Sequence, residues 1–472
     1  MSAMGYLATP SFIFIDEGAS VTFSRRDFLK LGSLGAIGAL TTSPFSRALA
    51  AAKTSDEFFI FIHAAGGWDV TLWADPRNER RGLIEPASTE NTDTAGLRHW
   101  VDAPLGGGAS SFALVHAPGS ERVFGPGIGN LLRHHDRFCV INGLSMNTVS
   151  HPDGVAFSAT GRHLQGSRVS QSSVNTILAH ELGVSQILPS VSINFPSAFA
   201  GAELDRRAVP LSVGSVGTIS RSLARSKLYD DEFDRRKVTA LLASESQQLA
   251  AQSTYPEVLD GMALQFGGLD RMLNGDMQEL FNEGKLKKAH PELNYKTKFH
   301  GAGAVSAAFA LEAIKRNVLR CFSFALGGFD THANNYKYQA MVQQDLFDLV
   351  AAILEQLDIT PHPTKTASKL SEHAHILVIS DFCRTPAINI AGGRDHYPNN
   401  SALVISPRFR GGLTFGKSDP DQLLPVEAKQ FLDGRRAIAP PDLLATFLSA
   451  FAVDPRRYLR DGEVVPELLL HS

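Results

Sequence analysis

The sequence predicts an α/β protein built on a mostly parallel β-sheet with helices on both faces. Two observations lead to this fold class. Several short apolar runs are followed by loops that carry Gly or Asp, which is typical of buried strands. Helix-like apolar patterns alternate with two of these runs between residues 300 and 380. Such alternation of helices and strands indicates a parallel sheet with helices packed against it.

Five apolar runs are the expected strands: Phe58–Ile62, Phe138–Ile141, Cys321–Leu326, Ile376–Ile379 and Ala402–Ile405. A helix is expected between the third and fourth runs, because apolar residues recur every three or four positions from Val342 to Leu357. The same pattern predicts a second helix from Ala307 to Val318. Residues 220–300 are charged and rich in Gln, and we interpret them as a helical insertion within a single domain of residues 51–472.

The composition excludes several classes of protein. The chain has 472 residues, of which 43% are hydrophobic and 20% charged, enough apolar residues for a large core. A formal net charge of −3 argues against a nucleic-acid partner, which usually needs a basic face. Three Cys residues are too few for a disulfide framework. No apolar segment is long enough to remain as a stable membrane span.

The first fifty residues have the pattern of an export signal. Residues 24–30 read Ser-Arg-Arg-Asp-Phe-Leu-Lys, the form of a twin-arginine signal, and a short apolar stretch follows from Leu31 to Leu40. Ala48-Leu49-Ala50 has the small residues of a cleavage site. We therefore expect export by the twin-arginine machinery, cleavage after Ala50, and a periplasmic or otherwise exported mature chain.

The loops after the expected strands should meet at one edge of the sheet. Two parallel strands joined by a crossover helix end at the same edge, where open α/β sheets bind their ligands. Asp330 and His332 follow the third run, and Asp381 follows the fourth, so these residues should flank one crevice. If the first two strands are also parallel, three more polar residues reach this edge: Asp69, Ser150 and His151.

Acidic and imidazole side chains in these loops predict a divalent metal site. In an extended segment, Asp330 and His332 lie on one face, and such a pair binds metal through oxygen and nitrogen. Further candidate ligands are Asp69, Asp381, Asp395 and His396. Zinc is the expected ion, and manganese and calcium also suit this chemistry. Taken singly, each residue is better explained as a turn, cap or surface residue.

Three residues are candidates for catalysis at such a metal. In Ser150-His151, a hydroxyl beside a metal can lose its proton and attack an ester. Alternatively, Ser150 caps a helix that begins near Pro152. Arg384 could hold a phosphate or sulfate with two hydrogen bonds, or could form a structural salt bridge to a nearby carboxylate.

Five segments in a fixed order carry a family resemblance: Gly66–Asp69, Ser150-His151, Gly327–His332, Ser380–Thr385 and Gly393–His396. The chain resembles the domain of unknown function 1501 family, which is similar to the alkaline phosphatase and sulfatase superfamily. The resemblance implies an alkaline-phosphatase-like fold with a two-metal centre and Ser150 near the nucleophile. Asp330, His332 and His396 would match the ligands of one ion. Asp69 and Asp381 would match the acids of the other.

Phe382 departs from this superfamily pattern, which often has His directly after the second-site Asp. This departure weighs against a second metal. Two functions follow from the sequence. The first is an exported metal-dependent hydrolase whose substrate is a small anionic phosphate or sulfate ester. The alternative is a non-catalytic protein that binds a cell-envelope component in the same crevice.

Overall fold

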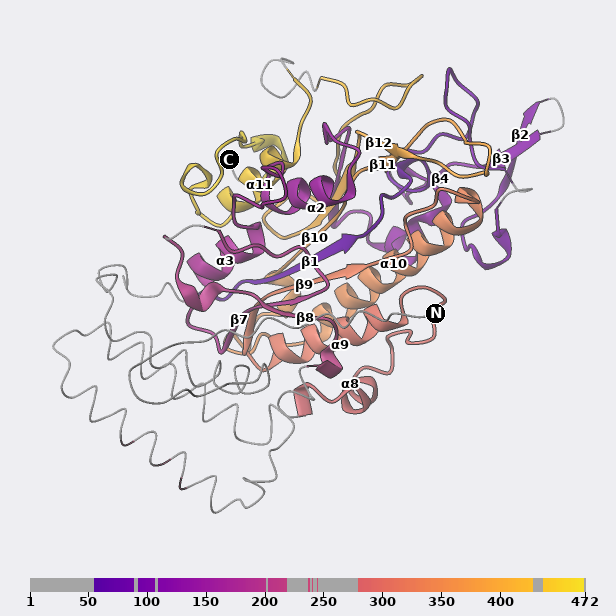
Figure 1. The fold of residues 1–472 in the computed structure, drawn as a ribbon. Helices are drawn as coiled ribbons and strands as arrows, with labels where there is room; N and C mark the ends of the chain where they lie inside the picture. The colour runs from indigo at the N-terminus through magenta and orange to yellow at the C-terminus, as the bar shows by residue number, and fades with distance from the viewer. Residues whose placement is uncertain are drawn as a thin grey trace, which may run out of the picture. The chain divides into compact units, whose positions relative to one another are not determined.

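A central sheet of eight strands organises the part of the chain that the computed structural model describes (Figure 1). That part comprises residues 55–88, 92–106, 109–200, 203–218, 237, 240, 244, 279–427 and 436–470. All of it belongs to one unit, Ala51–Ser472. The predicted signal region at 1–50 lies outside the described residues, as does most of the predicted insertion between 219 and 278.

The sheet is mostly parallel, as predicted. Its strands are, in spatial order, β14 (Thr414–Gly416), β6 (Phe138–Asn142), β13 (Ser401–Ile405), β10 (Ala374–Ser380), β1 (Phe58–Ala64), β9 (Leu319–Leu326), β7 (Leu188–Ile193) and β8 (Leu211–Val213). Only β13 runs against both of its neighbours. All five predicted strands are present, whereas β7, β8 and β14 were not predicted.

Both faces of the sheet are buried, which explains why its strands read as continuous apolar runs. In β1, Phe58, Ile60 and Ile62 belong to one core cluster. Phe59 and Phe61, which point the other way, belong to a second cluster. The strand therefore shows no alternation of polar and apolar residues.

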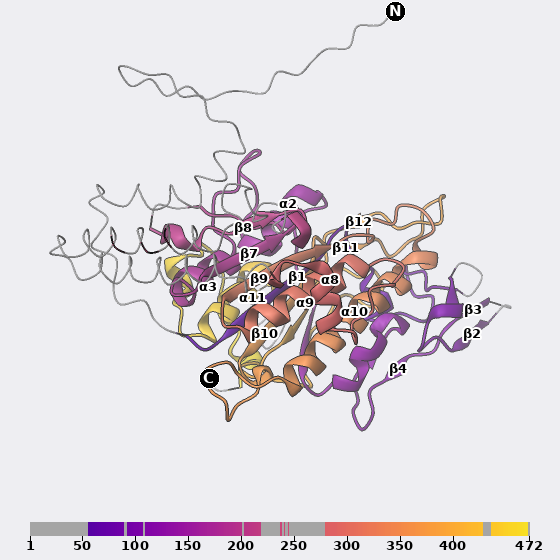
Figure 2. The same ribbon diagram turned by 90° about the horizontal axis from the view of Figure 1, so that it is seen from below.

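Helices cover each face, as predicted. The first core cluster includes residues of α9 (Gly301–Lys315) and α10 (Asn335–Ile359). Figure 2 shows these two helices side by side. The second cluster includes residues of α3 (Val174–Leu182) and α11 (Pro440–Ser449). Helix α2 (His151–Thr160) contacts both α11 and β10. The helix predicted over Ala307–Val318 ends at Lys315, and Val318 lies in the turn before β9.

Smaller elements complete the described chain. Helix α8 (Glu283–Ala289) falls in the last part of the predicted insertion. Three short two-stranded ribbons pair β2 (Asp102–Gly106) with β3 (Ala109–Phe112), β4 (Val115–His116) with β5 (Val123–Phe124), and β11 (Cys383–Arg384) with β12 (His396–Tyr397). Short 3-10 helices lie at Val70–Leu72, Thr94–Gly96, Pro126–His134, Arg206–Ala208, Leu370–Glu372, Pro455–Arg457 and Pro466–Leu468. Within the described residues, no helix is both long and apolar enough to cross a bilayer.

The strand directions bring the functional loops to one edge of the sheet. Strands β1, β6, β9 and β10 run the same way, so their carboxyl ends share an edge. Because β13 runs in the opposite direction, it begins at that edge, and β12 just before it lies there too. The reversed direction of β13 therefore places the segment before it at the same edge as the loops that follow β1, β6, β9 and β10.

Candidate metal centre

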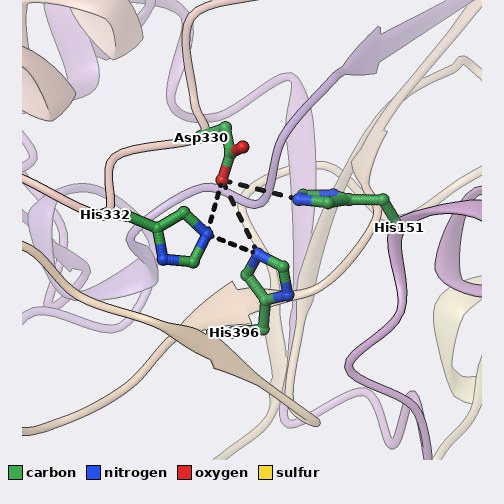
Figure 3. Close-up of side chains that lie close together, drawn as sticks. All are labelled: His151, Asp330, His332 and His396. Atoms are coloured by element: carbon green, nitrogen blue, oxygen red, sulfur yellow. Dashed lines mark hydrogen bonds and ion pairs between the residues drawn. The ribbon is translucent and has the colours of Figure 1, made fainter.

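Four side chains converge at this edge: His151, Asp330, His332 and His396 (Figure 3). Oδ1 of Asp330 lies 3.1 Å from Nε2 of His332, 3.4 Å from Nε2 of His151 and 3.6 Å from Nε2 of His396. The Nε2 atoms of His332 and His396 are 2.9 Å apart. A tetrahedral zinc site with arms of about 2.0–2.1 Å separates its ligands by about 3.4 Å. These spacings therefore fit a single small divalent ion.

The four candidate ligands come from three local structures. His151 is the first residue of α2, which has Pro152 in its first turn, where a helix needs no amide donor. Asp330 and His332 lie in the loop between β9 and α10. His396 lies in β12, directly opposite Arg384 of β11.

Glycines allow the loops to approach this closely. Gly66 has φ +118°, and a Cβ there would lie 2.5 Å from the backbone nitrogen of Asp330. A Cβ on Gly393 would lie 2.0 Å from the carbonyl carbon of His332. Both positions exclude any side chain, so the loop of Asp330 and His332 is held against the backbone on two sides.

The three imidazoles are anchored at their far nitrogens. The Nδ1 atoms of His151, His332 and His396 lie 2.6 Å from Asp381 Oδ2, 2.7 Å from Asp395 Oδ1 and 2.7 Å from the Val149 carbonyl oxygen, respectively. All three partners accept hydrogen bonds, so each Nδ1 donates, and in the neutral ring each Nε2 keeps its lone pair. Second partners of this kind orient metal-binding histidines and fix their tautomer.

Asp381 supports the centre without joining it. Its carboxylate contacts His63 Nε2 at 2.7 Å and accepts from the Gly66 amide at 3.2 Å, in addition to His151. Burial opposes ionisation of Asp381, but its interactions with His63, His151 and the Gly66 amide outweigh it and lower its pKa. The sequence-based prediction grouped Asp381 with the direct ligands. The structure differs because other partners already occupy its oxygens.

Arg384 does not face the crevice as an anion clamp. It is fully buried, and its guanidinium donates to the carbonyls of Gly66, Gly67 and Arg394. Its remaining bond, 2.7 Å long, goes to Oδ1 of Asp330. Burial raises the pKa of Asp330, but this bond and the charge of Arg384 outweigh it and lower that pKa. The alternative interpretation of Arg384 as a structural salt bridge describes this arrangement.

Asp69 also lies apart from the four converging side chains. It is fully buried and paired with Arg394, with Oδ2 and Nη1 3.3 Å apart. Asn335 donates to the same carboxylate at 2.8 Å, and Thr71 donates to it from both its amide and its hydroxyl. Asp69 therefore caps the 3-10 helix after β1 and neutralises a buried guanidinium, where the sequence had predicted a metal ligand.

Ser150 occupies the N-cap position of α2 and is exposed. Among the described residues its hydroxyl makes no capping bond, and none to the four converging side chains. The ring of Phe382 packs against His151 and His396, with centroids 4.8 and 4.6 Å apart. The residue directly after Asp381 is therefore an apolar ring in contact with two of the four converging side chains.

The charges around the centre favour a divalent cation. Asp330, Asp381 and Asp395 carry three negative charges, and Arg384 carries one positive charge. With the imidazoles neutral, the formal charge of this group is therefore −2, which a divalent ion would neutralise.

The sequence analysis missed His63, which contacts Asp381. Its only signal in the sequence is one imidazole in the otherwise apolar strand β1.

Comparisons with known proteins place the chain in context. A family model described as "Protein of unknown function (DUF1501)" matches residues 60–463. No curated protein matches the chain. The solved structure of Ps i-CgsB in complex with k-i-k-neocarrahexaose is 9% identical, with a TM-score of 0.32 over 85% of this chain and 73% of that one. A protein in the alkaline phosphatase superfamily from Vibrio parahaemolyticus is 9% identical, with a TM-score of 0.33 over 93% and 78%. Scores this low carry no argument on function.

Proposed function

The chain belongs to the DUF1501 family of proteins of unknown function, and we propose that it is a divalent-metal-dependent hydrolase of phosphate or sulfate esters. One observation carries the proposal. Three imidazole nitrogens and one carboxylate oxygen converge at the sheet edge, and every imidazole is anchored through its other nitrogen. Such preorganisation is typical of metal centres.

The residues fit one ion better than two. His151, Asp330, His332 and His396 would hold it, while Asp381, Asp395 and the Val149 carbonyl orient the imidazoles. Three nitrogens and one oxygen suit zinc or manganese better than calcium, which prefers oxygen ligands alone. A bound ion would act as a Lewis acid on an ester oxygen and stabilise the charge that develops there.

Metal analysis of the purified protein tests this proposal. We expect about one zinc or manganese ion per chain in the wild type, and its loss in an Asp330→Ala/His332→Ala double variant. The control is Asp136→Ala/His116→Ala, which removes the same two residue types from exposed positions. A panel of phosphate and sulfate esters, assayed with each metal, then identifies the reaction. A wild type that holds no metal after zinc and manganese are supplied contradicts the proposal.

A second candidate is a non-catalytic protein that binds a cell-envelope component. The specific observation in its favour is that Arg384 is fully engaged with protein groups and Ser150 makes no contact with the centre. Four protein ligands would also close a tetrahedral site, as in structural zinc sites. Stoichiometric metal that raises Tm, with no hydrolysis of any ester in the panel, would select this candidate.

We also propose that the mature chain acts outside the cytoplasmic membrane after cleavage behind Ala50. The twin-arginine pattern at residues 24–30 supports this location. Fractionation followed by N-terminal sequencing tests it. The expected mature protein begins at Ala51 in the exported fraction, and replacement of Arg25-Arg26 by Lys-Lys should retain it in the cytoplasm. An intact N-terminus on exported protein would contradict the proposal.

A further inference from the structure

His63 is a buried imidazole in the otherwise apolar strand β1. It is 1% exposed and is the penultimate residue of the strand, at the edge where the metal centre lies. Burying a polar ring is costly unless it makes a hydrogen bond. Its Nε2 lies 2.7 Å from Asp381 Oδ1, and Nδ1 has no hydrogen-bond partner among the described residues. The one polar contact of this ring is therefore with Asp381.

The carboxylate of Asp381 links two imidazoles. His63 occupies Oδ1, and His151 occupies Oδ2 at 2.6 Å. The Gly66 amide lies 3.2 Å from both oxygens and holds the group from a third side. An ionised carboxylate can only accept hydrogen bonds, so Nε2 of His63 and Nδ1 of His151 must both donate.

This arrangement determines which nitrogen of His151 faces the metal ligands. Because Nδ1 of His151 carries the hydrogen, its Nε2 keeps the lone pair that a metal requires. That Nε2 atom is buried, has no hydrogen-bond partner among the described residues, and lies 3.4 Å from Asp330 Oδ1. Without the hydrogen bond to His63, the Asp381 carboxylate could rotate, and His151 would lose its fixed acceptor.

We propose that His63 is a positioning residue that acts through Asp381 to hold His151 ready for metal binding. The inference rests on the proposed function, because that function supplies the metal. The effect of His63 on the His151 tautomer, however, does not require a bound metal. Among the described residues His63 makes no polar contact with the four candidate ligands, so its influence is indirect. Mutating the hydrogen-bond partner of a metal-binding histidine typically weakens metal affinity by about 10- to 100-fold. His63 acts on that partner rather than on the histidine, so its mutation should weaken affinity by about 10-fold.

Substitutions at position 63 separate the effect of the hydrogen-bond donor from the effect of the side-chain volume. His63→Gln places an amide N–H at a similar reach to Nε2, whereas His63→Phe keeps a ring and removes the donor. His375→Phe is the matched control, because His375 is also buried and bonds to a carboxylate, Glu57, at 2.8 Å. His375 lies on β10, opposite Phe59, four residues along β1 from His63. It therefore reports the cost of losing a buried imidazole away from the centre.

Two measurements test the proposal. The first is the ¹⁵N chemical shifts of the His151 ring in metal-free protein, assigned with a His151→Gln variant. We expect a protonated Nδ1 in the wild type, His63→Gln and His375→Phe, and a shift toward a mixture of tautomers in His63→Phe. The second is the Kd for zinc by chelator competition, which should rise about 10-fold in His63→Phe and less than about 3-fold in His63→Gln.

Each outcome has a defined meaning. The proposal is overturned if His63→Phe matches the wild type in both measurements, or if His63→Gln is as impaired as His63→Phe. If the wild type binds no zinc, the proposed function fails, and the ring shifts alone decide the role of His63. Should His63→Phe not fold, His63→Asn replaces it, because its shorter amide does not reach Asp381.

Discussion

Arg384 and Asp330 form an ion pair in which the guanidinium is fully buried and the carboxylate is half exposed, with Nη2 and Oδ1 2.7 Å apart. The same guanidinium binds carbonyls in the loop after β1 and in the segment before β12. A single side chain thus ties two segments to the loop of Asp330, a ligand of the candidate centre. Its five donors in a planar fork suit this task, which a lysine could not repeat.

Replacing Arg384 by Lys should destabilise the protein by about 3 kcal/mol, because it leaves buried carbonyls without donors. Urea unfolding measures this loss. Arg80→Lys is the control, because the Arg80 side chain is 75% exposed and its nearest partner atom, in Glu85, is 3.9 Å away. A variant at Arg384 with wild-type stability would instead support the role of anion clamp.

Removing the charge of Asp69 should mainly lower stability, whereas removing the charge of Asp330 should mainly abolish metal binding. Asp69→Asn leaves the buried Arg394 uncompensated and should lower the free energy of unfolding by about 3 kcal/mol, with metal content unchanged. Asp330→Asn should cost less stability, because this carboxylate is half exposed and the Asn oxygen can still accept from Arg384, but it should abolish stoichiometric metal. Unfolding curves and metal analysis on both variants check this. Loss of metal at full stability in Asp69→Asn would make Asp69 a ligand.

Gly393→Ala should weaken zinc binding by at least about 10-fold, because its Cβ would collide with the backbone of His332 and displace that ligand. Gly327→Ala is the matched control. It precedes Asp330 by three residues, and a Cβ there meets nothing within 4 Å. Chelator competition on both variants measures the difference. Equal affinities would show that the loop of His332 tolerates displacement.

The fold was predictable where burial makes the sequence pattern strong. Strands β1, β9 and β10 are long and buried on both faces, so each appears as a continuous apolar run. Strand β8 has only three residues, two of them exposed, and β14 is equally short. Such segments carry too few apolar residues to be distinguished from loops.

The sequence predicted which loops form the candidate site, but not what each side chain does there. The rule that ligands gather at the carboxyl ends of parallel strands brought Asp330, His332 and His151 together correctly. It could not show that Arg394 would neutralise Asp69, or that His63 and His151 would share Asp381. These roles depend on which buried partner lies nearest in space, and sequence spacing does not record that.

The pairing of Glu312 with His290 should make stability depend on pH. The ion pair with His290 lowers the pKa of Glu312 to about 2, against the effect of burial and helped by Lys315 and Arg316. Burial lowers the pKa of His290, but the ion pair with Glu312 and the hydrogen bond to Glu292 outweigh it and raise that pKa above 6.5. The His290 Nε2 and Glu312 Oε1 atoms are 3.3 Å apart. Both groups are therefore charged together over a broad range near neutrality.

The direction of the effect follows from the two shifts. The lowered pKa of Glu312 contributes stability that is complete above 4.5 and is lost as the pH falls toward 2. The raised pKa of His290 contributes stability that is complete below 6.5 and is lost as the pH rises through the raised value. Glu312→Gln should therefore cost most between pH 4.5 and 6.5, by roughly 2 kcal/mol, because both side chains are buried and the pair is charged there. Urea unfolding from pH 3 to 9 in a chelator measures the difference, with Glu121→Gln as an exposed control. A difference that stays constant across this range would mean that the pair adds no pH-dependent stability.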